Sequence, residues 1–493
     1  MKKRIDQITF FMENPHEVQE ETFRKLLYTA RDTEWGRKFG YADAPSVQQF
    51  KSRVPLSTYE DIFPQIERLM KGEQNILWPS EIKWFAKSSG TTNARSKFIP
   101  VSTESLEDCH FCGGKDLMTL FIQNRPDTKV FTGKGLSIGG SLQNSSSNIF
   151  SGDVSAVVMK NLPMWAQFIR TPHLEVALMD KWEEKINKMA EITSQENVTS
   201  ILGVPTWTIV LLERILEMTG KSSILEVWPN LEVFAHGAVS FQPYRDLFTQ
   251  KLFPSSAVSY LEIYNASEGF FGIQDDLSRP EEMLLMLDYG IYYEFIPLDE
   301  IHREHPRTLG LDEVVLNRNY AMVISTNAGL WRYKIGDTVK FTSLYPYRIK
   351  ITGRTKHFIN AFGEEVIIEN AEMALTKACQ ETGACVSDFT AGPVYMEGGK
   401  KGCHEWIIEF SRQPDNLMHF TQVLDSALRD INSDYDAKRY KDMALKLPLV
   451  RSVAEGTFYL WMKKRGKLGG QHKVPRLSNT RDYLDDILEL IEE

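Results

Sequence analysis

Strand-like and helix-like segments alternate between about residues 105 and 265, and this alternation restricts the fold more than any other feature of the chain. Short apolar runs bounded by turn residues are typical of buried strands, whereas a longer apolar run that begins at a proline is typical of a helix. The strand-like segments are 198–203, 231–235 and 258–264, and the helix-like segments are 205–216 and 242–252. This order predicts an α/β domain in which helices cover a sheet.

The chain is too long for a single hydrophobic core, and its character changes along its length. Its 493 residues favour two or more domains. Residues 283–352 hold short strand-like pieces separated by turns, which predicts a β-rich end to the large domain. From residue 354 onward, the helix and strand patterns fit a small α+β domain. We therefore predict a large N-terminal α/β domain at residues 1–353 and a small C-terminal α+β domain at residues 354–493.

The bulk composition excludes several classes of protein. A net charge of −9 argues against broad binding of nucleic acid or of anionic membranes. No apolar run is long enough to cross a bilayer or to form the core of a signal peptide. Five scattered cysteines do not make a disulfide framework, which favours a reducing compartment. We therefore expect a cytoplasmic protein that binds neither nucleic acid nor membrane.

The most informative stretch is the Ser/Gly/Thr-rich segment 88–97, which ends in Lys97 and follows a strand-like alternation of Ile82, Trp84 and Ala86. Small and hydroxyl side chains let backbone N–H groups approach phosphate oxygens, and a lysine adds positive charge. The segment does not match the GxxxxGK[ST] pattern of P-loop NTPases. Its composition fits a phosphate-binding loop and a polar surface loop equally well.

Two other patterns have simpler explanations than chemistry. Cys109 and Cys112 have CxxC spacing, but they lie in an apolar, helix-like stretch and no second pair of ligands follows them, so we interpret them as buried helix cysteines. Four aromatic residues could line an acyl pocket, although core packing is the usual role of such residues: Trp165, Trp207, Phe270 and Phe271.

Three later stretches join the hydroxyl-rich segment in a resemblance to a known family. They are Tyr264-Asn265-Ala266-Ser267-Glu268-Gly269, Trp331-Arg332-Tyr333-Lys334-Ile335-Gly336-Asp337 and Gly470-Gln471-His472-Lys473-Val474-Pro475-Arg476. The segment that ends in Lys97 is similar to the phosphate loop of the adenylate-forming superfamily, which includes luciferase, acyl-CoA synthetases and adenylation domains. The other stretches resemble one branch, the plant auxin-responsive acyl acid amido synthetases called Gretchen Hagen proteins and their bacterial relatives. Four motifs in the family's order extend the resemblance over nearly the whole chain.

This resemblance implies the architecture of the adenylate-forming superfamily, with ATP and Mg²⁺ as cofactors. It implies that the phosphates are contacted by Ser89, Thr91, Thr92 and Lys97.

The resemblance also assigns roles to the stretch that begins at Tyr264. It places Ser267 on the α-phosphate and Glu268 on Mg²⁺, and Tyr264 belongs to the same nucleotide-binding motif. One carboxylate with water and phosphate oxygens is a ligand set that octahedral magnesium accepts. Without the other motifs, a solvated acid after a strand is the favoured interpretation of Glu268.

Further implied contacts surround the sugar and the base. Asp337 follows Gly336 in a predicted tight turn and would accept hydrogen bonds from the ribose hydroxyls, although Gly-Asp is also common in ordinary turns. His236 and Gly237, at the end of a predicted strand, would border adenine and ribose. Arg354, just past the domain boundary, matches a hinge arginine that contacts the nucleotide.

Lys473 lies in a Gly-rich basic segment, and the resemblance implies that it swings onto the departing phosphate charge. Lys467 is the alternative for this role. Three positions depart from the family pattern. Lys356 stands where many relatives have a pivot aspartate, Ala94 stands where plant members have glycine, and Trp331 stands where tyrosine is usual. Lys356 leaves open how the small domain rotates between the two reaction steps, whereas neither Ala94 nor Trp331 removes a charged group that the chemistry requires.

The implied function is an ATP-dependent acyl acid amido synthetase, a carbon–nitrogen ligase. Its partners would be a small carboxylic acid, activated as an acyl-adenylate, and an amino acid whose amine accepts the acyl group. An acyl-CoA ligase of the same superfamily is the first alternative, and a catalytically idle nucleotide-binding protein is the second. The motifs name neither the acid nor the amine, and they do not set the oligomeric state.

Overall fold

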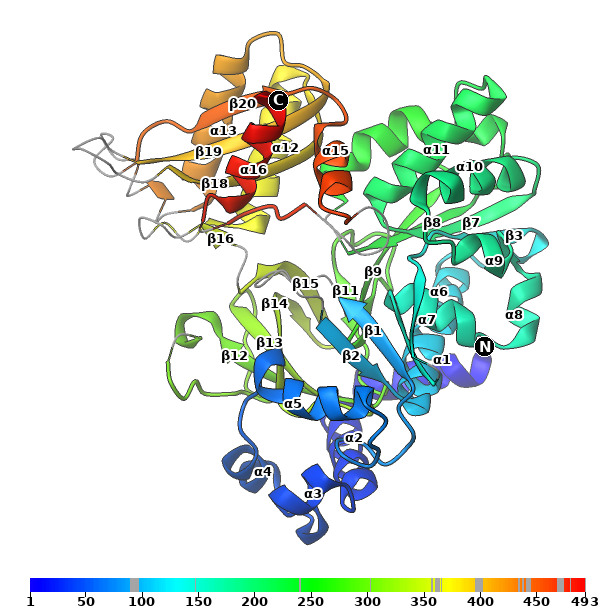
Figure 1. Ribbon diagram of the computed structural model, residues 1–493, viewed down its shortest axis with the longest axis vertical. Coiled ribbons are helices and arrows are strands. Elements are labelled where there is room, and N and C mark those ends of the chain that lie inside the picture. The colour runs from blue at the N-terminus through cyan, green and yellow to red at the C-terminus, as the bar shows by residue number, and fades with distance from the viewer. Residues whose placement is uncertain are drawn as a thin grey trace. The chain divides into compact units, whose positions relative to one another are not determined.

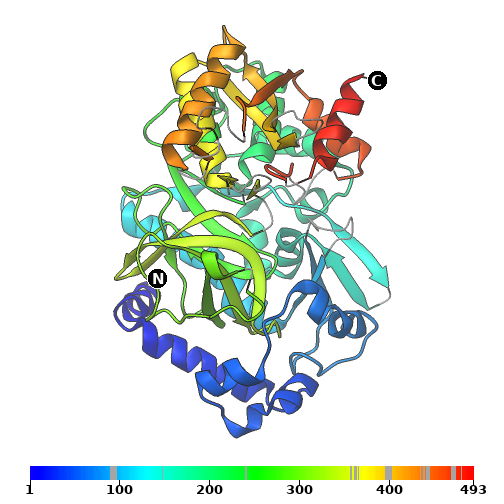
Figure 2. The same cartoon turned by 90° about the vertical axis from the view of Figure 1, so that its left-hand side faces the viewer.

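The structure is a computed structural model of the chain (Figures 1 and 2). It describes residues 1–492 except 89–96, 147, 239–240, 302, 356–357, 360–363, 365, 395–401, 433–434, 437–438, 440–444, 468–473 and 479. Inside helices and strands, the side chains of residues 88, 143–146, 182, 206, 243, 354 and 358 also fall outside the description.

The chain forms two compact units. The first contains Met1–Val239 and Lys251–Ile351, and the second contains Ser240–Gln250 and, in the described part, the residues from Thr352 onward. A short segment in the middle of the sequence therefore groups with the C-terminal unit. The division of the chain at residues 353 and 354 stays a prediction.

Five helices begin the first unit and gather at one of its ends (Figure 2). They are α1 (Lys2–Glu13), α2 (Pro15–Ala30), α3 (Glu34–Phe39), α4 (Val47–Arg53) and α5 (Tyr59–Met70). Local sequence sets their ends. Pro15 occupies the first turn of α2, where its missing N–H group costs no hydrogen bond. Gly40 ends α3 with a φ of 70°, and the Ser46 hydroxyl caps α4 by accepting a hydrogen bond from the Gln49 amide.

A small sheet follows, with strand order β2-β1-β5-β4. Its strands are β1 (Trp84–Ser88), β2 (Lys97–Val101), β4 (Leu142–Ser146) and β5 (Ile149–Gly152). Strands β1 and β2 are antiparallel, and their last pair in register joins Ser88 to Lys97. The hydroxyl-rich segment therefore connects two directly paired strands. After β2 come a π-helical segment (Ser105–His110) and α6 (Phe111–Asn124).

An eleven-stranded sheet forms the centre of the first unit, with strand order β12-β13-β14-β15-β11-β10-β9-β8-β7-β3-β6. Its parallel half consists of β3 (Lys134–Ser137), β6 (Arg170–Thr171), β7 (Val198–Gly203), β8 (Val233–Gly237) and β9 (Ser259–Ala266). The rest consists of β10 (Gly269–Ile273), β11 (Met283–Leu285), β12 (Ile291–Pro297), β13 (Asn319–Thr326), β14 (Tyr333–Leu344) and β15 (Tyr347–Arg354). Strands β10 and β12 are buried along their whole length, and Glu294 of β12 is the one charged residue in their two sequences.

Helices connect the parallel strands, as right-handed crossovers between parallel strands require. They are α7 (Val154–Asn161), α8 (Met164–Phe168), α9 (Leu174–Ala177), α10 (Trp182–Thr193) and α11 (Pro205–Thr219). Helices α10 and α11 lie side by side in Figure 1 and contact each other.

The second unit is a small α+β structure. Its three-stranded sheet has the order β18-β19-β20, with β18 (Cys385–Val394), β19 (Cys403–Arg412) and β20 (Leu449–Val453). A two-stranded ribbon pairs β16 (Phe358–Ile359) with β17 (Val366–Ile367). The helices are α12 (Ile368–Thr382), α13 (Leu417–Ile431), α15 (Thr457–Lys464) and α16 (Asp482–Glu492).

The predicted fold class is confirmed, because a large α/β unit with a β-rich end precedes a small α+β unit. One predicted element differs. The continuous helix expected at 242–252 is a 3-10 turn (Gln242–Tyr244) and a π-helical segment (Leu247–Leu252). No helix in the described part of the chain is both long enough and apolar enough to span a membrane.

Candidate functional site

The carboxyl ends of the parallel strands β8 and β9 lie at one edge of the large sheet. Their register pairs His236 with Glu262 and Gly237 with Ile263. Ligands of α/β proteins bind at this edge, because the loops that leave parallel strands converge there. The sequence motifs at 236–237 and 264–268 therefore come together through the topology of the sheet.

The end of β8 is tightly packed. His236 is buried, with its ring centroid 5.4 Å from that of Phe234. A Cβ atom on Gly237 would lie 2.4 Å from the carbonyl oxygen of Ile263, so only glycine fits there. Ala238 then adopts a φ of 72°, in the left-handed region that L residues rarely occupy. Such strain concentrates at functional sites, where the surrounding structure holds it in place.

Tyr264 and Asp337 are joined by a hydrogen bond. The Tyr264 hydroxyl donates to Oδ2 of Asp337 over 2.6 Å, and both residues are buried. Their strands, β9 and β14, are separated in the sheet by β10, β11 and β15. Because neighbouring strands lie about 4.8 Å apart, a flat sheet would keep these strands far from each other. The sheet must therefore curl, and the curl brings the second and third motifs into contact.

The predicted tight turn at Asp337 is wrong, because Gly336 and Asp337 lie inside the long strand β14. The register explains what the Gly-Asp pair does instead. Ala321 and Val323 of β13 pair with Thr338 and Lys334 of β14, so β14 has two extra residues at this point. Gly336 has a φ of 92°, which only glycine adopts without strain. The result is a bulge, a device that redirects a side chain within a sheet.

Ser267 and Glu268 follow β9 in the turn to β10. The Ser267 side chain is 4% exposed, and its Oγ makes no hydrogen bond with any described residue. A buried hydroxyl without a partner costs free energy, so this atom fits a ligand oxygen. Glu268 is half-buried. A single acid at this place fits a magnesium ion that takes its other ligands from water and phosphate.

Lys97 is the first residue of β2. Its ammonium lies 5.5 Å from the centre of the Tyr59 ring, and the Tyr59 hydroxyl accepts a hydrogen bond from the Phe98 amide. Tyr59 therefore supports both the lysine and the strand that carries it. The other predicted phosphate contacts, Ser89, Thr91 and Thr92, lie outside the described residues.

The remaining predicted site residues belong to the second unit. The backbone of Arg354 ends β15, and its side chain is outside the described part. Lys473 also lies outside the described residues. Its alternative, Lys467, follows α15, and burial lowers the pKa of its ammonium.

The π-helical segment and α6 pack against β10. Cys109 Sγ accepts a hydrogen bond of 3.1 Å from the Phe270 amide, and a Cβ atom on Gly113 would lie 2.4 Å from the Phe270 ring. Burial raises the pKa of the Cys109 thiol to about 12, which makes it a poor nucleophile. Among the described residues, no group of three acidic, histidine or cysteine side chains is placed to hold a metal. Cys109 is thus a buried cysteine in a helical segment, as predicted, whereas Cys112 at the start of α6 is only half-buried.

Arg332, in the motif at 331–337, has a structural role that the sequence motif did not indicate. Arg332 is buried with a φ of 42° and forms a two-pronged ion pair with Glu294 of β12, with both distances 3.0 Å. It also donates to the carbonyl oxygens of Lys51 and Val54, and so fixes the end of α4 to the sheet. No periodicity or spacing in the sequence could have indicated this network, because Arg332 lies 38 residues from Glu294 and 281 and 278 residues from Lys51 and Val54.

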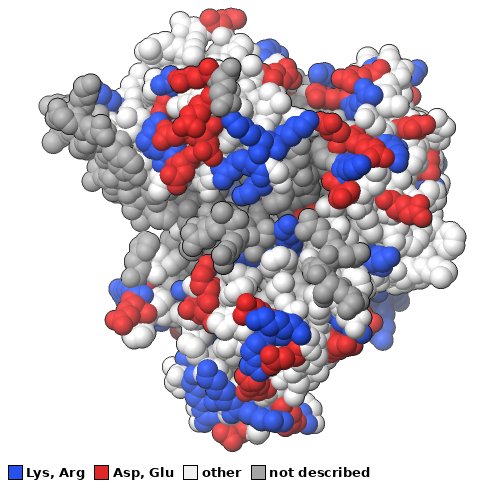
Figure 3. Space-filling view, in the orientation of Figure 1, with Lys and Arg blue, Asp and Glu red and all other residues white. Residues whose placement is uncertain are grey.

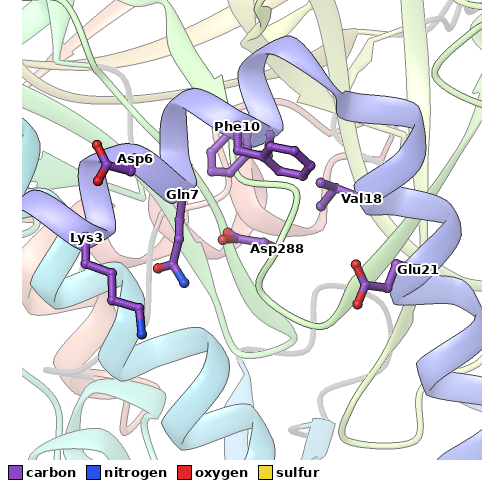
Figure 4. A pocket seen from close by; sticks show the side chains of 8 residues that line it. Lys3, Asp6, Gln7, Phe10, Val18, Glu21 and Asp288 are labelled. Carbon is purple, nitrogen blue, oxygen red and sulfur yellow. The ribbon is translucent and has the colours of Figure 1, made fainter.

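The surface shows a hollow and a mixed pattern of charge. An open hollow between α1 and α2 is lined by Lys3, Asp6, Gln7, Phe10, Phe11, Val18, Glu21 and Asp288 (Figure 4). None of these residues belongs to a motif. On the face shown in Figure 3, basic and acidic side chains are interspersed.

The comparisons with known proteins agree with the motifs. Residues 4–258 match the GH3 family N-terminal domain, residues 284–354 the GH3 family central domain, and residues 369–482 the GH3 family C-terminal domain. The chain belongs to the GH3 family. The resemblance to Gretchen Hagen proteins is thereby confirmed.

Relatives in this family are named as ligases that join acids to amino acids. The chain is 24% identical to the indole-3-acetic acid-amido synthetase GH3.3 of Arabidopsis thaliana, over 93% of this chain and 89% of the relative. It is 23% identical to the 4-substituted benzoates-glutamate ligase GH3.12 of the same plant, over 94% and 93%. The predicted enzyme class, an acid–amino acid ligase, therefore agrees with the names of its relatives.

Solved structures share the fold. The GH3.15 acyl acid amido synthetase superposes with a TM-score of 0.81 at 18% identity, over 99% of this chain and 96% of that one. A 2-hydroxyisobutyryl-CoA ligase in its postadenylation state superposes with a TM-score of 0.62 at 11% identity, over 96% and 91%. These two likenesses confirm the predicted fold, because the chain shares it with an acyl acid amido synthetase and with an acyl-CoA ligase.

Proposed function

We propose that this GH3 protein activates a small carboxylic acid with ATP and transfers the acyl group to the amine of an amino acid. The observation that carries the proposal is the meeting of two family motifs, through Tyr264 and Asp337, beside the unpartnered Ser267 hydroxyl at the carboxyl edge of the sheet. Family membership supplies the reaction class, and this geometry supplies a place for a nucleotide.

In the first step, a carboxylate oxygen attacks the α-phosphorus of ATP, and the bond from that phosphorus to pyrophosphate breaks. Both reactants are anions, so the protein must offset negative charge and hold them in line. We assign Ser267 to the α-phosphate, and Lys97 with Ser89, Thr91 and Thr92 to the departing phosphates. The buried, unpartnered Oγ of Ser267 supports its assignment.

A second group of residues would hold the nucleoside. Asp337 would accept hydrogen bonds from the ribose hydroxyls, with the Tyr264 hydroxyl fixing the orientation of its carboxylate. His236 and Gly237 would border the ribose and the adenine. The strained backbone of Ala238, with a φ of 72°, supports a functional role for this end of β8.

Glu268 would hold Mg²⁺, which offsets charge on the phosphate oxygens when it is bound.

We also propose a domain boundary at residues 353 and 354, with Arg354 contacting the nucleotide beside it. Lys473 would bring a further positive charge to the leaving pyrophosphate, as a mobile lysine does in adenylate-forming enzymes.

In the second step, the amine nitrogen attacks the acyl carbonyl, the bond to AMP breaks and the nitrogen loses a proton. An acyl-CoA ligase would use the same first step and a thiol in the second. The structural likeness to a CoA ligase favours keeping this second candidate. The two candidates differ only in the acceptor.

The test is acid-dependent exchange of labelled pyrophosphate into ATP, measured with a panel of aromatic, indole and aliphatic acids. We expect exchange with at least one acid, followed by an amide when amino acids are supplied and products are detected by mass. A thioester with coenzyme A and no amide would favour the CoA ligase. No exchange with any acid would reject both candidates and leave an idle nucleotide-binding protein.

A further inference from the structure

Arg170 is a buried cation that has no acidic partner among the residues that the structure describes. It begins β6, at the far edge of the parallel half of the sheet, and is 6% exposed. Its Nη1 donates to Gln167 over 3.2 Å, and its Nη2 lies 2.8 Å from the sulfur of Met159. Within the described ranges, its Nε has no hydrogen-bond partner and its guanidinium makes no ion pair. The neighbouring Thr171 hydroxyl is also buried without a partner.

A second buried cation lies close by. Lys185 of α10 is 1% exposed, and its ammonium donates to the carbonyl oxygens of Gly139 over 2.6 Å and Gly140 over 2.9 Å. Burial lowers the pKa of Lys185 to about 8; the charge of Asp153 opposes this shift and the charge of Arg170 adds to it. The carboxylate of Asp153 accepts a hydrogen bond from the Ser141 amide. This cluster therefore combines two cations with one acid.

A buried guanidinium without an acidic partner costs free energy unless a bound anion neutralises it. Taking an unpaired charge out of water costs several kcal/mol, and buried arginines are normally paired with carboxylates. A guanidinium presents a planar fork of donors that matches the two oxygens of a carboxylate. The Nε of Arg170 adds a further donor to this fork, because it has no hydrogen-bond partner among the described residues. The chemistry of the cluster thus fits one bound carboxylate.

Met159 locates the guanidinium relative to the carboxyl edge of the sheet. Its sulfur contacts Arg170, and its Cε lies 2.3 Å from where a Cβ atom on Gly139 would stand. Gly139 follows the end of β3, so the Arg170 head lies near the carboxyl end of β3 rather than out on β6. Strands β7 and β8 separate β3 from β9. With neighbouring strands about 4.8 Å apart, the ends of β3 and β9 are about 14 Å apart.

This separation selects the source of the carboxylate. The α-carboxylate of an acceptor amino acid is one carbon away from the attacking nitrogen, which is too close to span from the adenylate at β9 to the end of β3. An acid whose two carboxylates are separated by a ring or by several carbons spans most of this distance, and polar contacts of about 3 Å at each end span the rest. We propose that Arg170 binds a second carboxylate at the far end of the acid substrate, so that the preferred acid is a dicarboxylate. This inference rests on the proposed function, because it uses the same edge of the sheet.

The test compares acids that differ only in the second carboxylate. The pairs are 4-carboxybenzoate with benzoate, and heptanedioate with heptanoate, each measured by pyrophosphate exchange. We expect the diacid of a pair to have a kcat/KM at least about tenfold higher, as a charge-assisted pair supplies. Arg170→Gln should remove this preference and leave the monoacid within about twofold of wild type. Arg170→Lys should keep part of it. Lys188→Gln, at an exposed position of α10, is the matched control and should leave the kcat/KM of both acids unchanged.

Three results would overturn the inference. The first is activation of monoacids by the wild type with no gain from the second carboxylate. The second is a diacid preference that survives in Arg170→Gln. The third is a raised KM for glutamate relative to glutamine as acceptor in that variant, with exchange unchanged, which would move the carboxylate to the acceptor.

A separate measurement keeps this inference distinct from the proposed function. If no acid supports exchange, the proposed function fails, and calorimetric titration with 4-carboxybenzoate decides the subsite alone. Binding that Arg170→Gln abolishes would support it, and absent or unaltered binding would reject it. The melting temperature of Arg170→Met checks the fold; removing an unpaired buried charge should leave it unchanged or raise it.

Discussion

The Tyr264 hydroxyl donates a hydrogen bond of 2.6 Å to Oδ2 of Asp337, although three strands separate these residues in the sheet. The bond fixes the orientation of the Asp337 carboxylate, which would accept hydrogen bonds from the ribose hydroxyls. Tyr264→Phe should therefore raise the KM for ATP about tenfold, since a hydrogen bond to a charged group contributes about 1.5–3 kcal/mol. Pyrophosphate exchange at varied ATP measures this. The matched control is Tyr435→Phe, which removes a buried tyrosine bond to Asp425 in the second unit and should leave the KM for ATP unchanged.

The bulge at Gly336 sets the direction of the Asp337 side chain, so changing it should weaken the binding of ATP. Gly336→Ala forces a φ of 92° on a residue with a Cβ atom and should cost about 1–2 kcal/mol of stability. It should also raise the KM for ATP, because relaxing the bulge redirects Asp337. Gly220→Ala is the control: Gly220 ends α11 with a φ of 66° and has open space around it. It should cause a similar loss of stability in urea denaturation without any change in the KM for ATP.

Glu268 should be required for adenylation but not for folding. Glu268→Gln keeps the shape of the side chain and removes the charge that magnesium needs, so exchange should fall by about 1,000-fold or more. The melting temperature should stay close to that of wild type, because Glu268 is only half-buried. Glu191→Gln, at an exposed position of α10, should have wild-type exchange. Wild-type exchange in Glu268→Gln would remove its magnesium role.

Alanine variants of Lys473 and Lys467 should differ in how strongly they impair adenylation. Lys473→Ala should impair adenylation far more than transfer from a supplied acyl-adenylate, because its charge would act on the leaving pyrophosphate. Lys467→Ala should have the smaller effect on adenylation. Single-turnover measurements of each half-reaction decide this. Equal loss of both half-reactions in Lys473→Ala, or the stronger loss of adenylation in Lys467→Ala, would contradict the assignment.

The predicted strands 231–235 and 258–264 end two residues before β8 and β9 do, and the sequence did not indicate which strand ends meet. The ends of β8 and β9 follow from the alternation of segments and from the rule that parallel strands share a carboxyl edge. The contact between Tyr264 and Asp337 depends on how strongly the sheet curls, and a local pattern carries no measure of that curl. Gly336-Asp337 was predicted as a turn because glycine serves both turns and bulges, and only the pairing with β13 distinguishes the two.

Buried charges were the least predictable part of the site. Arg332 and Glu294 are paired across two strands, and Arg170 and Lys185 are brought together by a strand and a helix. In the sequence, each of these residues is an ordinary charged residue, which is usually exposed. Burial and proximity arise only from the tertiary fold, so these residues could not be separated from the other charged residues of the chain.

His110, behind the site, should make stability depend on pH. It is buried beside Asn265, and burial lowers the pKa of its imidazole to about 4, with a hydrogen bond to Asn265 opposing the shift. The folded state therefore excludes the proton that the unfolded chain binds below its ordinary pKa of about 6.5. This contribution to stability is complete above pH 6.5 and is lost as the pH falls from there toward 4. It should lower the free energy of unfolding by about 2 kcal/mol between pH 7 and pH 5.

Urea denaturation of wild type and His110→Gln at pH 7, 6 and 5 measures the contribution of this residue. Buried or paired carboxylates can also change stability over this range, so the difference between the two proteins isolates the imidazole. We expect the loss of stability from pH 7 to pH 5 to be about 2 kcal/mol smaller in the variant. His419→Gln, at an exposed position of α13, should lose as much stability as wild type. Parallel pH profiles of wild type and His110→Gln would show that His110 is protonated inside the folded protein, and would remove burial as the factor that sets its charge.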